Sequence, residues 1–407
     1  SGQPVRTTSD GVVTRDEVLF KGVSRVLRKV TSRDGAVAEQ EWISGRLRRA
    51  SSELGGVSEF FYDGFSRLYR TVTQQNGVRR STLTEYDADG NAVAETVSSG
   101  GEGRTLRRTL DADGNVVREE GADGIVIRFE YDLRGNLVLE HGDTYMVAYA
   151  YDHRGRRISM TTWRNAGEEG DTTQWNYDSR GRMVRKTYAD GTHIDYAYDA
   201  DGNVTSRTSA RGVVRIYAYD MGGRPVSVSY TDGTPSTACI YDRAGRMVSV
   251  TDAAGTRTLG YDTNGNCVSE SVPQVPGCSL SRTFDTLNRR TGICLGNGIN
   301  ADVEATFAYD ELGRVASVTC GESEVVIEYR THGNDIAGKR WQKGGGDVAS
   351  VAAAYDAWSD ITEISFSTAG DVHRMGYRYD SVGRRTRTEL ADGTSWLYGY
   401  DRLSQVI

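Results

Sequence analysis

Hydrophobic and polar residues alternate with a period of two over short stretches of the chain. In residues 193–198, Ile and two Tyr occupy every second position, with His, Asp and Ala between them, and residues 125–131 repeat this pattern. Such alternation is typical of a β-strand with one apolar face. No stretch carries apolar residues at helical spacing for three turns. We therefore expect an all-β protein in which helices are absent or short.

Short turn signals separate the alternating stretches. Asp-Gly between two alternating segments is a strong hairpin signal, because both residues tolerate the backbone angles of a tight turn. Such signals occur at Ala122-Asp123-Gly124, Ala189-Asp190-Gly191, Thr231-Asp232-Gly233 and Ala391-Asp392-Gly393. The fold class that we predict is a continuous ribbon of repeated antiparallel β-hairpins, forming a curved or spiral strip.

A repeat dominates residues 61–407. The pair Tyr-Asp begins at residues 62, 86, 131, 151, 177, 198, 219, 241, 261, 309, 355, 379 and 400. Variant pairs fill the gaps at Leu110-Asp111, Phe284-Asp285 and Tyr329-Arg330, which gives about sixteen units at spacings of 20 to 26 residues. Unequal spacing suits hairpins whose second loop differs in length.

Each unit is written aromatic-Asp-x-x-Gly-Arg/Asn. The Asp carboxylate can accept hydrogen bonds from backbone amides further along the chain, and Gly supplies the positive φ that ends a type I turn with a bulge. We therefore predict a structural turn at each unit and no catalytic role. Five units represent these turns: Tyr131, Asp132, Gly135, Asn136; Tyr151, Asp152, Gly155, Arg156; Tyr177, Asp178, Gly181, Arg182; Tyr198, Asp199, Gly202, Asn203; and Tyr241, Asp242, Gly245, Arg246.

Residues 1–60 resemble weaker copies of the same unit. Arg follows Gly or Ser at Gly45-Arg46 and Ser24-Arg25, and turn signals occur at Ser9-Asp10-Gly11 and Arg33-Asp34-Gly35. We interpret this region as degenerate repeats that continue the strip. The sequence stops at Ile407, six residues after the last repeat Asp, which we interpret as a break in the middle of a unit.

Composition narrows the classes of function. The 407 residues carry 49 Lys+Arg and 56 Asp+Glu, a net charge of −7, and the basic residues are scattered. Proteins that bind nucleic acid usually carry a contiguous stripe of basic residues, so we expect no nucleic-acid partner. No run approaches 18 apolar residues, so we expect no membrane span. The five Cys show no metal-ligand spacing, and we expect buried or half-buried thiols, with a Cys267–Cys278 disulfide as the alternative.

Candidate chemistry in the chain has a structural interpretation in each case. Residues 87–91 superficially resemble a calcium loop but lack its Gly and Glu positions, so turn capping is favoured. No two His or Cys share ligand spacing, and nothing places two carboxylates across a cleft. We expect no enzyme activity, cofactor or metal. The repeat Tyr could stack on sugars, although a packing ladder is favoured, and each repeat Arg could pair with the Asp of a neighbouring hairpin.

The repeated string Tyr-Asp-x-x-Gly-Arg/Asn resembles the YD-repeat, or RHS-repeat, family over nearly the whole chain. This resemblance implies a β-hairpin strip that spirals into a large hollow shell. Relatives include Rhs polymorphic toxins, the cocoon-forming subunits of toxin complexes, and teneurins, and in the toxins the shell encloses a C-terminal toxin domain. Many of them carry an Asp-Pro-x-Gly signature and an aspartate-based self-cleavage site. Asp-Pro does not occur here, so no cleavage residue is carried over.

These features predict a structural shell segment of a large secreted or cell-surface bacterial protein, which encapsulates or presents a polypeptide such as a toxin domain. Its partners would be the remaining shell and the enclosed C-terminal domain of the parent protein. The alternative is a cell-surface adhesion module that binds glycan or a protein receptor. We expect a curved wall around a solvent-filled space, with loops at 164–173 and 342–349 projecting from it.

Overall fold

The computed structural model describes residues 5–9, 12–21, 25–31, 37–52, 55–165, 167–271, 278–296 and 301–407. They form two compact units. The first contains Ser1–Val126 and Ala305–Ile407, and the second contains Ile127–Glu304. The chain thus leaves the first unit once and returns to it. The turn signals at Asp10-Gly11 and Arg33-Asp34-Gly35 lie outside the described residues.

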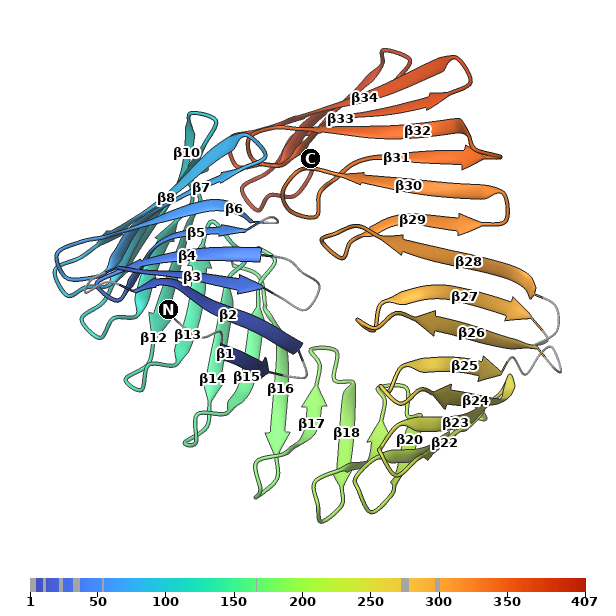
Figure 1. Ribbon diagram of the computed structural model, residues 1–407. Coiled ribbons are helices and arrows are strands. Elements are labelled where there is room, and N and C mark those ends of the chain that lie inside the picture. Colours follow the sequence, from blue (N-terminus) through green and yellow to red (C-terminus); the bar gives the residue numbers. More distant parts are fainter. Residues whose placement is uncertain are drawn as a thin grey trace. The chain divides into compact units, whose positions relative to one another are not determined.

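The described residues contain 36 strands and no helix, which confirms the predicted all-β fold of antiparallel hairpins. Figure 1 shows the strands following one another in chain order. The first unit holds β1 (Val5–Ser9), β2 (Val12–Lys21), β3 (Arg25–Thr31), β4 (Val37–Ile43), β5 (Arg46–Ser52), β6 (Gly56–Tyr62), β7 (Leu68–Gln75), β8 (Val78–Tyr86), β9 (Ala92–Ser99), β10 (Glu102–Leu110) and β11 (Val116–Glu120), and then β29 (Val315–Cys320), β30 (Ser323–Tyr329), β31 (Ile336–Lys343), β32 (Gly346–Tyr355), β33 (Ile361–Thr368), β34 (Asp371–Tyr379), β35 (Arg385–Glu389) and β36 (Ser395–Leu397).

The second unit is built in the same way. It holds β13 (Leu137–Gly142), β14 (Val147–Tyr151), β15 (Arg157–Thr162), β16 (Asp171–Tyr177), β17 (Met183–Thr187), β18 (His193–Tyr198), β19 (Val204–Thr208), β20 (Val214–Tyr219), β21 (Pro225–Tyr230), β22 (Thr237–Tyr241), β23 (Met247–Asp252), β24 (Gly255–Tyr261), β25 (Cys267–Ser271), β26 (Ser279–Phe284) and β27 (Arg290–Gly296). The unit boundaries fall within β12 (Val126–Tyr131) and β28 (Ala301–Tyr309).

Successive strands pair antiparallel in a simple meander. In the first unit this holds from β1 to β11 and from β29 to β36. In the second it holds from β13 to β27. Such a meander needs only short connections, which agrees with the dense turn signals of the sequence.

The repeat turns that join two of the named strands end with a shift in strand register. Between β16 and β17, Asn176 pairs with Arg185 but Tyr177 pairs with Met183, so one residue of β17 is left over. This is a β-bulge, which follows a type I turn that closes on a residue with positive φ. The same shift recurs at Tyr198 and Tyr241.

Few side chains in the sheet are buried. The apolar residues that are buried among the described ones are Val72, Ala94, Ile194 and Cys278. The accessible surface is 25005 Å², whereas a compact globular protein of 44.6 kDa exposes about 15,600 Å². Within the described part of the chain, no second layer therefore covers the strands as in a sandwich. Ladder hydrogen bonds and contacts between neighbouring hairpins carry much of the stability.

The two predicted loops differ in outcome. Residues 163–170 connect β15 to β16, so the expected loop at 164–173 exists but ends three residues earlier, and residue 166 lies outside the described part. The loop expected at 342–349 is wrong. There, Gly344 and Gly345, both with positive φ, form a tight turn, and the flanking polar residues continue β31 and β32. Polar residues fit these strands because a single sheet leaves side chains exposed.

Candidate functional site

One carboxylate organises each repeat turn that carries the repeat Asp. At Asp178, the backbone N–H donates to the carbonyl of Arg182 at 2.9 Å, and the N–H of Gly181 donates back to the Asp178 carbonyl at 3.0 Å. The side-chain Oδ1 accepts from the amides of Arg180 and Arg182, both at 2.9 Å, and Oδ2 accepts from Arg182 Nε at 2.8 Å. Gly181 has φ +87°, which a side chain with a Cβ adopts only with strain. The turn is thus closed by both backbone and side chain.

The twenty residues selected from the sequence all lie in turns of this geometry. The turns are 131–136, 151–156, 177–182, 198–203 and 241–246, and each has the two backbone hydrogen bonds and a Gly with positive φ. In the turns that carry Asn, the amide Nδ2 of Asn replaces the guanidinium, as in the 2.9 Å bond from Asn203 to Asp199. These residues shape the backbone.

The Arg that ends a turn also contacts the next hairpin. Arg182 Cζ lies 4.6 Å from the ring centroid of Tyr198, and its terminal nitrogen donates to the carbonyl of Asp199 at 3.0 Å. The Tyr198 hydroxyl donates to the carbonyl of Met183 at 2.7 Å, directly after the Arg. Adjacent repeats are therefore joined in both directions.

The stacking of Arg on the next Tyr recurs along the chain. It is present for Arg67 on Tyr86, Arg156 on Tyr177, Arg224 on Tyr241, Arg246 on Tyr261, Arg314 on Tyr329 and Arg384 on Tyr400. The expectation that each Arg pairs with the Asp of a neighbouring hairpin is wrong. Its ion pair is with the Asp of its own turn, because Nε comes within reach of that carboxylate once the turn closes.

The repeat Tyr residues that follow a turn ending in Arg are engaged in this contact. Burial, and then the neighbouring Tyr196, raise the pKa of the Tyr198 phenol above its ordinary value. With the hydroxyl bonded and an Arg on the ring, little of the aromatic face is left for a sugar. The geometry agrees with a packing ladder, which the sequence analysis favoured.

The turn carboxylates are held in their charged form. Partial burial tends to raise the pKa of Asp152, but hydrogen bonds from the amide and guanidinium of Arg156, and from the amide of Arg154, outweigh it and lower the pKa to about 2. Hydrogen bonds from Asn203 similarly lower the pKa of Asp199. A carboxylate used in this way is unsuited to general acid catalysis near neutral pH.

A second feature lies within the first unit, where two distant parts of the chain meet. Asn76 and Gly77 form the two-residue turn between β7 and β8, both with positive φ, as in a type I′ hairpin. At this tip, Asn76 Nδ2 donates to the carbonyl of His332 at 2.9 Å, and the His332 amide donates to Asn76 Oδ1 at 2.8 Å. The two residues are 256 positions apart.

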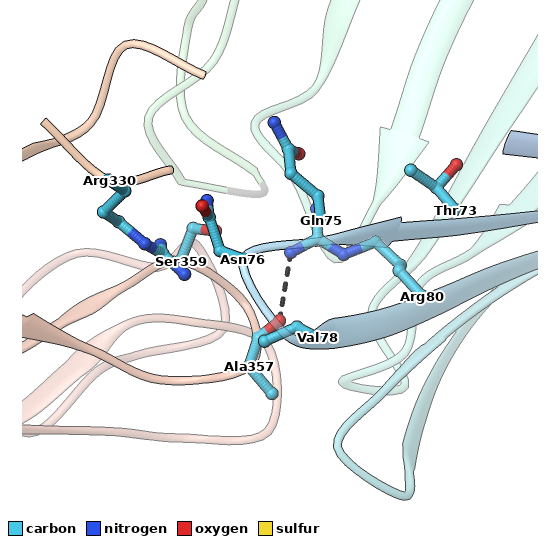
Figure 2. Close-up of a pocket in the computed structure, with 8 residues that line it drawn as sticks. All are labelled: Thr73, Gln75, Asn76, Val78, Arg80, Arg330, Ala357 and Ser359. Carbon is cyan, nitrogen blue, oxygen red and sulfur yellow. Dashed lines mark hydrogen bonds between the residues drawn. The ribbon is translucent and has the colours of Figure 1, made fainter. Parts of the chain in front are cut away.

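Further contacts extend this region to the turn after β32. Ser99 Oγ and a terminal nitrogen of Arg80 donate to the carbonyl of Ala357, at 2.5 and 3.1 Å, and Ser99 is only 2% exposed. Figure 2 shows the Arg80–Ala357 bond as a dashed line. Arg104 Cζ lies 3.9 Å from the ring centroid of Trp358. We call this region the seam; it comprises Asn76, Arg80, Ser99 and Arg104 on one side and His332, Ala357 and Trp358 on the other.

Sequence reasoning missed the seam, because a repeat fixes neighbours along the strip and does not indicate which distant turns meet. Two local signals do mark it. Asn76-Gly77 is a hairpin turn of the strongest kind, and the unit at Tyr329-Arg330 has Arg where fifteen other units have Asp.

The other candidate chemistry gives no site. All five cysteines are free thiols, so the Cys267–Cys278 disulfide is not formed, and Cys320 is exposed, contrary to the expectation of burial. In the calcium-like segment, Asp87 Oδ1 accepts from the Asn91 amide at 2.8 Å and caps a turn. Among the described residues, no group of three or more His, Cys, Asp or Glu could hold a metal ion. A helix able to span a membrane is likewise not found in the part of the chain that the structure describes.

Comparison with known proteins gives one family and several similar folds. The family described as Teneurin YD-shell matches residues 49–229 and 209–406. No curated protein shows significant similarity to the chain. A crystal structure of TcdB2-TccC3-TEV matches 97% of this chain and 24% of that one, with a TM-score of 0.61 and 15% identity. A crystal structure of TcdB2-TccC3 without its hypervariable C-terminal region matches 97% of this chain and 27% of that one, with a TM-score of 0.63 and 13% identity. The chain thus spans about a quarter of these structures and shares their fold.

Proposed function

Because the chain belongs to the Teneurin YD-shell family, we propose that it is a wall segment of a shell that encloses a polypeptide, and that it has no catalytic role of its own. The parent protein would be secreted or exposed at a bacterial cell surface. The rest of the wall would come from further repeats, since the similar structures are about four times as long as this chain.

One observation carries the proposal: the strands that the structure describes form a sheet without a covering layer. The accessible surface of 25005 Å² is about 1.6 times that of a compact protein of the same mass. A sheet of this kind presents both faces to its surroundings and can separate an inside from an outside. The Arg–Tyr contacts between hairpins would stiffen such a wall, since a turn that ends in Arg, such as 177–182, is joined to the next by a hydrogen bond and a cation–π contact.

The enclosed partner would be a polypeptide such as a C-terminal toxin domain. One of the similar structures is that of TcdB2-TccC3 without its hypervariable C-terminal region. We extend this arrangement to the parent of the present chain as part of the proposal. Enclosure requires no catalytic residue. This agrees with the turn carboxylates, whose oxygens accept hydrogen bonds from the backbone amides of their own turn.

The adhesion alternative receives less support from the geometry. A glycan platform needs open aromatic faces, whereas the repeat Tyr rings that follow a turn ending in Arg are covered by that Arg and their hydroxyls are bonded, as at Tyr198 and Tyr261. Binding of a protein receptor by exposed turn residues is the form of this alternative that the geometry leaves open.

Protease protection tests the proposal. A protein that contains this chain within its complete set of repeats would carry a protease site in the segment expected inside. We expect this site to resist cleavage in the native protein and to be cut within minutes after mild denaturation. Placing the same site at the exposed residues 167–169 is the control and should give rapid cleavage throughout. Equal cleavage of both sites in the native protein would contradict enclosure.

A further inference from the structure

The unit at residues 329–335 departs from the repeat in both sequence and structure. Arg330 stands where other units have the capping Asp. Its amide donates to the carbonyl of Asp335, five residues on, whereas the turns described above close four residues on. The departure therefore removes a carboxylate and puts a guanidinium in its place.

Arg330 is directed into the seam. Its side chain is only 14% exposed, its Cζ lies 4.8 Å from the ring centroid of Tyr355, and one terminal nitrogen lies 3.2 Å from an oxygen of Asp335, which is 42% exposed. An ion pair with a carboxylate so open to solvent is weak. The charge of Arg330 is thus only partly balanced at a largely buried position.

A cavity of about 140 Å³ lies beside Arg330 in the seam (Figure 2). By the same measure one water needs about 10–15 Å³, so the cavity has room for a small molecule. Its lining includes Asn76, Arg80, Arg330, Ala357 and Ser359, and Figure 2 labels the full set. Two guanidinium groups and several neutral polar groups thus surround one space, and no carboxylate is among the residues that line it.

Arg80 is the less satisfied of the two cations. Among the described residues it has no ion-pair partner, and its Nε is buried without a hydrogen-bond acceptor. Its contacts are the bond to the Ala357 carbonyl and a 5.8 Å approach of Cζ to the Trp358 ring centroid. A buried charged donor without an acceptor is costly, and structures usually supply one.

We propose that this cavity binds a small oxyanion, held between Arg80 and Arg330. Guanidinium groups match carboxylate and phosphate oxygens in charge and in hydrogen-bond geometry. The Ser359 hydroxyl and the second hydrogen of Asn76 Nδ2, whose first is bonded to the His332 carbonyl, supply further donors. The oxyanion is either a free inorganic ion or a carboxylate carried by a polypeptide. Because it would link the two sides of the seam, its binding stabilises the contact between β7–β8 and the turns after β30 and β32.

Calorimetric titration tests this site in the 407-residue chain. Inorganic phosphate and acetate are titrated separately into protein in chloride buffer at constant ionic strength. We expect saturable binding of at least one of them, with one site per chain, and a rise in the thermal midpoint with its concentration. Preference for phosphate assigns the site to an inorganic ion, and preference for acetate assigns it to a polypeptide carboxylate.

Three variants test whether binding depends on the two arginines that line the cavity. Arg80→Gln and Arg330→Gln should each weaken binding by about tenfold or more, because each removes a charged donor. Arg79→Gln is the matched control: it lies next to Arg80 on β8, is exposed, and changes the net charge equally, so binding should be unchanged. Circular dichroism checks that each variant is folded, and Arg330→Gln decides the matter if Arg80→Gln unfolds. Absence of saturable binding to the parent chain, or equal weakening by Arg79→Gln, would overturn the proposal.

Discussion

The guanidinium of Arg182 lies over the ring of Tyr198 in the next repeat, with 4.6 Å between Cζ and the ring centroid. The same Arg donates through Nε to the Asp of its own turn at 2.8 Å. One side chain thus fixes a turn and joins it to its neighbour. A strip of hairpins with few buried residues depends on such contacts for the spacing of its strands.

Asn stands in place of Arg in several repeats. Replacing Arg182 by Asn therefore separates its bond to the Asp of its own turn from its contact with the Tyr of the next repeat. Arg182→Asn should keep the bond to Asp178, as Asn203 does with Asp199, but lose the contact with Tyr198. We expect the free energy of unfolding to fall by about 0.5–1.5 kcal/mol, measured by urea denaturation. Arg211→Asn, at an exposed hairpin turn, is the control. Equal effects of the two substitutions would show that the Tyr198 contact contributes nothing specific.

Positive φ at Gly245 predicts a sharp dependence on the residue type. Gly245 has φ +82°, which a β-branched side chain adopts only with strain. Gly245→Val should therefore lower the free energy of unfolding by about 1–3 kcal/mol. Gly245→Asn should cost less, because Asn tolerates this region and Asn288 adopts φ +61° at the equivalent position. Thermal melting of both variants gives the comparison, and a Val variant as stable as the Asn variant would refute the turn assignment.

Acid should weaken the turns within a defined pH window. The pKa of Asp152 is lowered from 3.8 to about 2 in the folded chain. Because the folded value is depressed, the carboxylate contributes its full stability above the unfolded pKa and loses it as the pH falls through the folded pKa. The contribution of Asp152 to the thermal unfolding midpoint should thus stay nearly constant between pH 7 and 5. It should be lost as the pH falls from about 4 to 2.

Asp152→Asn tests this assignment. The variant should be less stable at pH 7, because Asn cannot accept through two charged oxygens, and its midpoint should fall less steeply than that of the parent below pH 4. Asp201→Asn removes the same charge from an exposed position in another turn. A steeper acid decline in the Asp152 variant than in the parent chain would contradict the lowered pKa.

Hydrogen exchange tests the seam. Asn76→Ala removes both bonds to the His332 backbone, so the amides of 330–335 should exchange about tenfold faster, which corresponds to the loss of about 1.4 kcal/mol of local stability. Asn165→Ala, which removes a side-chain bond to Glu168 in the second unit, should leave them unchanged. Unaltered exchange in the Asn76 variant would mean that the seam does not hold this turn.

The sequence predicted what is local and missed what is distant. The turn at 177–182 can be predicted from its local sequence, because every hydrogen bond that closes it joins residues at most four positions apart. The seam contact of Asn76 with His332 depends on how small twists accumulate over many strands, which no repeat motif encodes. The sequence also does not identify the carboxylate that the repeat Arg pairs with. The Asp of its own turn and the Asp of the neighbouring hairpin are both candidates, and only the closed turn places Nε beside the Asp of its own turn. The polar segment at 342–349 was misjudged because a sheet without a second layer accepts polar residues in its strands.

Small-angle X-ray scattering of the chain in solution tests the central claim, that the strip is an open wall. A compact protein of 407 residues has a radius of gyration of about 22 Å. We predict a clearly larger value, with a distance distribution depleted at short separations, as expected for a sheet whose two faces both contact solvent. A radius near 22 Å with the distribution of a filled globule would contradict the wall and, with it, the proposed enclosure.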